Sequence, residues 1–533
     1  MTTTNEAASP DATDQGTPHD GNATQQSATP PPRAPMSNGA RTLTAIVLAI
    51  TMLITLNQLI ASYKGWAAGR AAGQTTPAQA PLPPAPDEAQ QRRFALEVRG
   101  VGLAVDRLRQ SGIWQAIDAA DSPFQRVLSD DPADYEWSGL ERHRDLDSRE
   151  AYAAKSVLEG WVERWPIPVL VASPESRTSG SSRVRGAHQH ASLPIHLATT
   201  LDSHVGEGAD QLIIQLFDLF DADPQLPAVV LFGIDSEALK LTDAPDEHFV
   251  PDIHDAAAAI LVARTDRVDR DIRPYLTDVP YDLTYLDKEY DVIQLWNAYW
   301  DADEDPAGPR HTDLGFMSTQ FWQERQQKLI DRVDPNGGQY QLTPFWMRKY
   351  GFKPNPWVPV RWTKWQMEEY DKAPLLGYLH RPVEVPLDAP AGPKGDKARA
   401  AAMAEGWQQA LDTLPEGTAP TRLFYDTAGE GRRLIPLSRA MSTEGTPHPL
   451  AIDDPANSYD LTRRLGNTGV SSPFVQLALA LMRSYHHGGA SATVNLREDA
   501  RASIIMVRPP DDAQKAANRR RPDPFVNPYA PLD

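Results

Sequence analysis

The sequence LTAIVLAITMLITLNQLIASY, residues 43–63, divides the chain into two unequal parts. About 21 residues at a rise of about 1.5 Å each span roughly 30 Å, the hydrocarbon thickness of a bilayer. This long apolar run predicts a single transmembrane helix over 42–63. A buried helix of a soluble domain is one alternative, but polar segments on both sides leave the run no core to join. A cleaved signal peptide is another, but the leader before the run, about 40 residues, is longer than such peptides allow.

The charges that flank this run set its expected orientation. Arg33 and Arg41 precede it and Lys64 and Arg70 follow it, so the count used by the positive-inside rule is nearly balanced. Further arginines on the C-terminal side, beginning at Arg92, favour a cytoplasmic body. A periplasmic body stays open as the alternative.

The segments next to the run have the composition of disordered chain and spacer. Residues 1–41 are rich in Thr, Pro, Asn and Gln and cannot bury enough apolar surface to offset the entropy of ordering. Residues 64–91 form a linker rich in Pro and Ala, and its repeated prolines favour an extended polyproline spacer. Residues 511–533 are predicted to be a loose tail.

Composition excludes several classes of function for the rest of the chain. The formal net charge is −19 at pH 7, which disfavours nucleic acid as a partner because phosphate binding needs a basic face. The 533 residues contain no cysteine. Disulfides, thiolate nucleophiles and zinc–cysteine sites are therefore absent from its chemistry.

Helix and strand patterns alternate through the body, which predicts a mixed α/β fold in an N-terminal body, 92–280, and a C-terminal body, 371–510. In the first, strands are expected at 94–105, 166–172, 228–232 and 256–263, and helices at 106–117 and 210–220. In the second, regular structure is expected at 375–385, a helix at 397–414, a strand at 422–425, a helix at 474–485 and a hairpin of 492–496 with 503–507. Ser472 and Pro473 are the expected N-cap and first-turn residue of the helix at 474–485.

Residues 281–370 differ from both bodies and hold seven of the thirteen tryptophans. One interpretation is an irregular subdomain that packs itself with aromatic side chains. The other is a partner-binding surface, because Trp, Tyr and Arg dominate interface hot spots. On the second interpretation the predicted partner-binding residues are Trp346, Trp357, Trp362 and Trp365.

The motifs of known enzyme classes are missing or better explained by loops. No G-x-S-x-G motif occurs, and the nearest sequence, GASAT at 489–493, lacks the last glycine and enters a strand. His188, His190, His196 and His204 lie in a polar segment that predicts a solvated loop rather than a metal site. The acidic residues of 301–305 lack the glycine and terminal glutamate of a calcium loop. No catalytic, metal or cofactor site is therefore expected.

Four stretches carry a family resemblance: FALEVRGVGLAVDRLRQSGIWQAI (94–117), GFKPNPWVPVRW (351–362), LGYLHRPVEVPL (376–387) and GWQQALDTLP (406–415). With these stretches the body, from about 94 to 509, resembles the type VI lipase adapter family of bacterial type VI secretion clusters. The resemblance implies a non-enzymatic adapter that binds a phospholipase effector in the cytoplasm and helps to load it onto the VgrG spike. The inner membrane would be a further partner through the helix at 42–63.

A second resemblance concerns the fold. LGNTGVSSPFVQLALALM (465–482), followed by a hairpin, is similar to the C-terminal half of thiolase-like and ketoacyl synthase domains. Those enzymes use a cysteine nucleophile, so the resemblance implies a degenerate thiolase-like fold without a catalytic cysteine, used for binding. Two other hypotheses stay open: a periplasm-facing, membrane-tethered binder of the immunity type, and an enzyme with an unrecognised site.

Overall fold

The computed structural model describes residues 93–278 and 361–518, apart from short gaps. It also describes Met317–Ser318, residues 523–525 and four residues between 352 and 358. The gaps lie at 123, 136–138, 164, 175–179, 194–196, 204–207, 241–247 and 391. The predicted tail 1–41, membrane helix 42–63 and linker 64–91 lie outside the described residues, as does most of 281–370. Among the described helices, none is long and apolar enough to cross a membrane.

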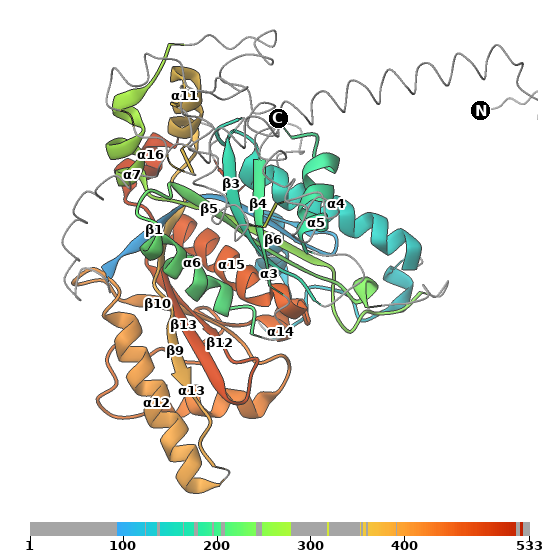
Figure 1. The fold of residues 1–533 in the computed structure, drawn as a ribbon. Coiled ribbons are helices and arrows are strands. Elements are labelled where there is room, and N and C mark those ends of the chain that lie inside the picture. The colour runs from blue at the N-terminus through green and yellow to red at the C-terminus, as the bar shows by residue number, and fades with distance from the viewer. Residues whose placement is uncertain are drawn as a thin grey trace, which may run out of the picture. The chain divides into compact units, whose positions relative to one another are not determined.

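A single mixed sheet runs through the described residues, with the strand order β11-β10-β12-β13-β8-β1-β6-β5-β3-β4-β7 (Figure 1). The first half contains β1 (Ala95–Val105), β3 (Pro166–Ala172), β4 (Leu197–Ser203), β5 (Ala228–Asp235) and β6 (Ala256–Ala263). The second half contains β8 (Gly377–His380), β10 (Pro420–Asp426), β11 (Ser458–Asp460), β12 (Ala490–Asn495) and β13 (Arg501–Arg508). Three short strands add to it: β2 (Leu108–Arg109) beside β1, β7 (Met317–Ser318) beside β4 and β9 (Val383–Pro386) beside β13.

The two halves repeat one topology. In each, the second strand lies parallel between the third and the fourth, and the fifth lies antiparallel between the fourth and the first. The halves join where the first strands pair antiparallel, with Ala95 opposite His380. The predicted mixed α/β class is therefore confirmed by the strand register.

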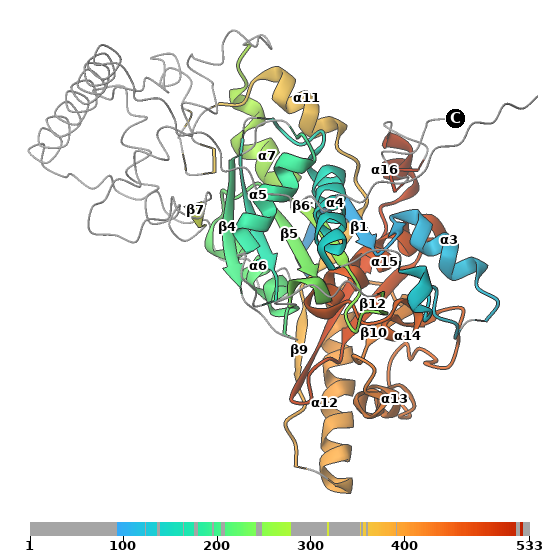
Figure 2. The same ribbon diagram turned by 90° about the vertical axis from the view of Figure 1, so that its right-hand side faces the viewer.

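Helices connect the strands at equivalent places in both halves. The first half uses α4 (Gly139–Leu158), α5 (Gly180–His190) and α6 (Gln211–Ala222), and the second uses α12 (Pro393–Leu411), α13 (Ile435–Met441) and α15 (Ser472–His487). The remaining α-helices of the described part are α3 (Ser111–Ala119), α7 (Thr265–Asp271), α11 (Lys364–Lys372), α14 (Leu461–Leu465) and α16 (Asp512–Ala517). In both ribbon views α12 extends away from the sheet (Figures 1 and 2).

The central element of the core is α15, which is buried on nearly all sides. It contacts β10, β12 and β13 of the second half as well as β1, β5 and β6 of the first. Phe474 lies so close to β5 that a Cβ on Gly233 would come within 2.2 Å of its ring. A glycine is therefore required there for close packing of the helix on the strand. This helix joins the two halves through one hydrophobic core.

Three segments differ from the sequence-based expectations. Residues 106–117 were predicted as one helix, but Asp106 and Gln110 have positive φ and enclose the short strand β2 before α3 begins. The His-rich segment predicted as a loop contains the helix α5. The predicted loose tail contains α16, which opens with a capping box, and Phe525 is fully buried. The N-cap of α15 is Ser471 rather than Ser472, whose hydroxyl is engaged elsewhere.

Candidate functional site

The N-terminal end of α15 meets the carboxyl ends of β5 and β10, which finish at Asp235 and Asp426. In α/β proteins the carboxyl ends of parallel strands are the usual location of ligand sites. Both aspartates are almost completely buried, so each must be compensated by close polar partners. These contacts form a buried polar network, and it is the strongest candidate for a functional site in the described part of the chain.

Asp426 is the centre of the second-half side of this network. Arg497 donates from Nη1 to its Oδ2 at 2.8 Å, and the hydroxyls of Ser472 and Thr462 also donate to it. The backbone N–H of Ala428 donates to Oδ1 at 2.8 Å. Burial alone would raise the pKa of Asp426, but Arg497 and these donors together hold it below its usual value. The carboxylate is therefore held in its charged form and is a poor proton donor.

Asp235 reaches the same helix end from the first half. It accepts hydrogen bonds from the backbone N–H groups of Ser236 and Val470, both at 2.8 Å. Burial raises its pKa in spite of these two donors. Gly469 has a φ of 57°, and a Cβ there would lie 1.8 Å from Oδ2 of Asp235. The turn before α15 therefore needs glycine for both its backbone conformation and the approach of this carboxylate.

Asn467 links the Asp426 side of the network to the turn before α15 and to His254. Its side-chain oxygen accepts from Arg497 Nη2 at 2.9 Å and from the N–H of Gly469 at 3.0 Å. Its backbone carbonyl accepts from the N–H of His254 at 2.8 Å. The residue therefore connects the Asp426 side of the network with a second group of charged residues around His254.

His254 is fully buried between a carboxylate and a guanidinium. Its Nδ1 lies 2.6 Å from Oδ2 of Asp106, and its Nε2 lies 3.1 Å from Nη2 of Arg126. A guanidinium can only donate, so Nε2 accepts and Nδ1 carries the proton given to Asp106. The two contacts place the ring proton on Nδ1. They also occupy the lone pair of Nε2, which a general base would need free to accept a proton.

Asp255 completes this group beside Asp106. Arg149 lies 3.1 Å from its Oδ2, and the hydroxyl of Ser236 donates to its Oδ1. Burial raises the pKa of Asp255, and the neighbouring Asp106 adds to that rise while Arg149 opposes it. The serines of the network thus donate to carboxylates that arginines already hold. Such pairing stabilises charges and favours a structural network over nucleophilic catalysis.

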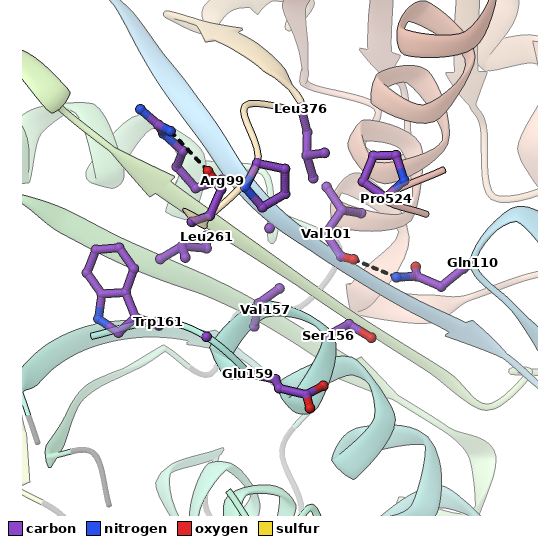
Figure 3. Close-up of a pocket in the computed structure, with 14 residues that line it drawn as sticks. Arg99, Val101, Gln110, Ser156, Val157, Glu159, Trp161, Leu261, Leu376 and Pro524 are labelled. Atoms are coloured by element: carbon purple, nitrogen blue, oxygen red, sulfur yellow. Dashed lines mark hydrogen bonds between the residues drawn. The ribbon is translucent and has the colours of Figure 1, made fainter. Parts of the chain in front are cut away.

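Two cavities of the described part lie away from this network. A cavity of about 120 Å³ between β1, the end of α4 and residues 373–376 is lined by Arg99, Gln110 and Trp161, among others (Figure 3). Gln110 bridges Val101 O at 2.6 Å and Leu103 N at 2.9 Å, and Arg99 donates to Ala373 O at 3.2 Å. The volume is well below the roughly 300–1,000 Å³ of small-molecule sites. An open groove of about 570 Å³ lies near the C-terminal end of α12.

Metal binding finds no support in the described residues, where no group of three or more His, Asp or Glu side chains is arranged around a common point. His188 and His190 lie on α5. His196 and His204 fall in gaps, and the acidic residues of 301–305 lie outside the described residues.

Comparison with protein families decides the relationship of this chain. Residues 94–251 match the family described as type VI lipase adapter protein Tla3, N-terminal, and residues 376–509 match type VI lipase adapter protein Tla3, C-terminal. The chain belongs to the type VI lipase adapter family. The family predicted from the sequence is confirmed. Of the four stretches that suggested it, three lie inside the matched residues, and 351–362 lies between the two matches.

Solved ketosynthases are similar to this adapter-family chain at low identity. A ketosynthase domain from Streptomyces albus JA3453 has a TM-score of 0.39 and 8% identity, covering 82% of this chain and 98% of its own. A 3-oxoacyl-acyl-carrier-protein synthase III from Aquifex aeolicus VF5 has a TM-score of 0.34 and 11% identity, covering 78% and 99%. A bacillaene synthase ketosynthase from Bacillus subtilis 168 has a TM-score of 0.40 and 8% identity, covering 78% and 71%.

The predicted partner-binding tryptophans do not share one environment in the structure. Trp357 and Trp362 are fully buried, so they belong to the core of this adapter-family protein and cannot present their rings to a partner. Trp362 packs edge-on against Trp165, with ring centres 5.5 Å apart, and Trp165 donates from Nε1 to the carbonyl of Trp357 at 2.8 Å. Trp365 is half-buried, and Trp346 lies outside the described residues. Trp357 and Trp362 therefore contribute to aromatic packing inside the protein and not to an exposed binding surface.

The site residues predicted from the sequence do not include Asp235, Asp426 or Arg497. A usable signal was present, because Asp235 and Asp426 each follow a short apolar strand, in AVVLFGID and LFYD. Acidic residues at the carboxyl ends of buried strands are typical of sites in α/β folds. The pairing with Arg497, 71 positions after Asp426, had no such local signal.

Proposed function

We propose that this protein is a non-enzymatic adapter that binds a phospholipase effector and helps to load it onto the VgrG spike of a type VI secretion system. The observation that carries the proposal is the family match in both halves of the body, at 94–251 and 376–509. The acidic charge of the chain also suits a protein partner better than nucleic acid.

The absence of an enzymatic role is supported by two independent features. The chain has no cysteine, so a thiolase-like fold would lack the nucleophile on which such enzymes depend. At the end of α15, Asp426 is held by Arg497, and His254 is held between Asp106 and Arg126. We interpret the body as a degenerate thiolase-like fold whose interior positions are filled by its own ion pairs. Turnover of acyl thioesters or phospholipids by the purified protein would overturn this interpretation.

Effector binding is tested by co-purification. The tagged full-length protein should retain the lipase encoded beside it from a detergent extract, and a strain that lacks the adapter should fail to secrete that lipase. A second effector of the same secretion system serves as the control and should be secreted normally. A lipase that does not bind and is secreted at the normal level in the deletion strain would refute the adapter function.

The membrane part of the proposal is a single-pass helix at 42–63 in the inner membrane with a cytoplasmic body. It is supported by the length and apolar character of 43–63 and by the arginines from Arg92 onward. Because the charges that flank the run are nearly balanced, a second candidate stays open, a periplasm-facing binder of the immunity type. Protease treatment of spheroplasts separates the two, because protection of the body supports cytoplasmic loading and digestion supports the periplasmic binder.

A further inference from the structure

Residues 124–130 form a surface segment that reaches the buried network through one arginine. Phe124, at its start, is 51% exposed. The backbone of the segment is tied to Arg464, which donates from Nη1 to the carbonyl of Gln125 at 3.1 Å and accepts from the N–H of Val127 at 2.9 Å. Neither contact involves a side chain that titrates near neutral pH. These bonds therefore hold the segment regardless of pH.

Arg126 is the side chain of this segment that points inward. Its Nη2 lies 3.1 Å from Nε2 of the fully buried His254, and its Nη1 pairs with Asp130 of the same segment. Gly466, which follows α14 with a φ of 81°, lies directly against this contact. A Cβ at that position would come within 2.6 Å of Nε2 of His254 and 2.7 Å of Nη2 of Arg126. The glycine thus leaves room for the arginine to reach the ring.

The contact between Arg126 and His254 requires a neutral imidazole. A guanidinium can only donate, so Nε2 accepts from Arg126, while Nδ1 gives its proton to Asp106 at 2.6 Å. A second proton has one place to bind on the ring, which is Nε2. Its uptake would remove the hydrogen bond from Arg126 and place two cations against each other. Imidazole is the side chain whose charge ordinarily changes between pH 5 and 8.

Other titratable and charged groups surround His254 on the elements packed against it. They are Asp106 and Arg109 at the β1–β2 turn, Arg142 and Arg149 of α4, Asp255 next in the chain, and Asp130 and Tyr135 after the arginine. In the part of the chain that the structure describes, the guanidinium of Arg126 hydrogen-bonds to Asp130 and His254. Because Asp130 belongs to the same segment, His254 is the partner that joins this side chain to the interior.

We propose that the contact between Arg126 and His254 is a pH-sensitive latch for residues 124–130. With a neutral ring, the latch holds the arginine against the interior and fixes the segment. When His254 binds a second proton, Arg126 is released towards solvent, and the segment keeps its backbone bonds to Arg464. The latch thereby couples the protonation of a buried residue to the surface that presents Phe124.

A single spin label tests the latch, because the chain contains no cysteine that would compete for it. The label is placed on the full-length protein at Gln125→Cys, an exposed position of the segment, and its electron paramagnetic resonance line shape gives the mobile fraction. This fraction should rise several-fold from pH 8 to pH 5, the range over which an imidazole gains its proton. A label at Lys397→Cys, on the exposed side of α12, should give the same line shape at both pH values and so controls for acid unfolding.

Three variants in the Gln125→Cys background assign the response to the latch. His254→Gln keeps an acceptor for the arginine but does not titrate, so the label should stay immobile at both pH values. Arg126→Met lacks the latch, so the label should be mobile at both. Arg463→Met is the matched control, because that neighbouring guanidinium lies over the ring of Phe124 at 4.6 Å, and the pH response should remain.

Two results would overturn the proposal. One is a line shape that does not change between pH 8 and pH 5 while the protein stays folded, and the other is a pH response that persists in His254→Gln or Arg126→Met. Hydrogen exchange of residues 124–130 in the unlabelled wild type provides an independent measurement. After correction for the intrinsic pH dependence of exchange, protection should be lower at pH 5 than at pH 8, and equal protection would refute the latch.

Discussion

Substitution of Arg497, which pairs with Asp426, is the strongest single test of the buried network. Both side chains are 1% exposed, and the carboxylate also accepts from the hydroxyls of Ser472 and Thr462. In Arg497→Met the aliphatic part of the side chain is kept and the charge is lost. A buried carboxylate left without its cation typically costs about 3–5 kcal/mol. We therefore expect the free energy of unfolding at pH 7 to fall by about that amount.

The pH dependence of this loss has a definite sign. In wild type the pKa of Asp426 is held below its usual value, so its contribution to stability is present above the unfolded pKa and is lost as the pH falls through the folded pKa. Without Arg497, burial becomes the dominant influence and should raise that pKa above the unfolded value. The variant should therefore recover stability as the pH falls from 7 towards 5. Urea denaturation followed by tryptophan fluorescence at both pH values measures the difference.

A matched substitution separates the network from general loss of charge. Arg432 pairs with Asp499 on the surface, where the two side chains are 68% and 60% exposed. Arg432→Met should cost less than about 1 kcal/mol, because exposed ion pairs contribute little. If Arg497→Met also costs less than about 1 kcal/mol, or if its loss is the same at pH 5 and pH 7, the assignment of a charged, compensated Asp426 is wrong.

The other predictions concern the core, the turn before α15 and a second buried acid. Trp362→Ala should lower the free energy of unfolding by about 3–5 kcal/mol, because the ring is fully buried, and any loss of effector binding should follow the loss of stability in thermal unfolding. Gly469→Ala should lower the free energy of unfolding by at least about 1–3 kcal/mol, because the residue has a positive φ and its new Cβ would meet Asp235. Gly431 has open space around it, so Gly431→Ala should leave the free energy of unfolding unchanged in the same denaturation assay. Burial raises the pKa of Glu150 to about 7. As the pH rises from about 4.5 to 7, the free energy of unfolding of wild type should therefore fall relative to that of Glu150→Gln, with no further relative fall above pH 7. Parallel unfolding curves of that pair across pH 5–8 would contradict the raised pKa.

The parts of the fold that were predicted correctly from the sequence are those whose signals are local. Residues 166–172 and 256–263 are continuous apolar runs bounded by turn residues, and they form β3 and β6 with the same limits. Residues 106–110 were mistaken for helix because their structure depends on distant contacts. Gln110, for example, bonds through its side chain to Leu103 and Val101 of β1. The capping box of α16, formed by Asp511 and Gln514, was a local signal that could have been used.

The candidate site was hidden for a different reason. Its members come from both halves of the sheet, and Asp235 bonds to Val470 at a separation of 235 positions. Composition shows that charged residues exist, but only the fold shows which of them meet. The tryptophans illustrate the same limit, because a high aromatic content is typical of both cores and interfaces. Burial, which separates the two, is a property of the assembled structure.

The charged contacts between the two halves explain why buried charges are used where apolar residues would pack. Asp235 and Val470 join the first half to the second, and Arg501 of β13 joins Asp210 at the start of α6, with the shortest contact at 2.8 Å. Buried ion pairs add little net stability over apolar residues, but they penalise any arrangement that leaves one partner alone. In two halves of equal topology, apolar packing by itself would permit small shifts of one half against the other. The charged contacts that cross between the halves therefore select one relative arrangement. On this account a double variant that removes the pair between the halves, Arg501→Met with Asp210→Leu, should keep most of its stability yet unfold less cooperatively than wild type. A double variant that unfolds in a single sharp transition would show that the apolar core fixes the arrangement without the charges.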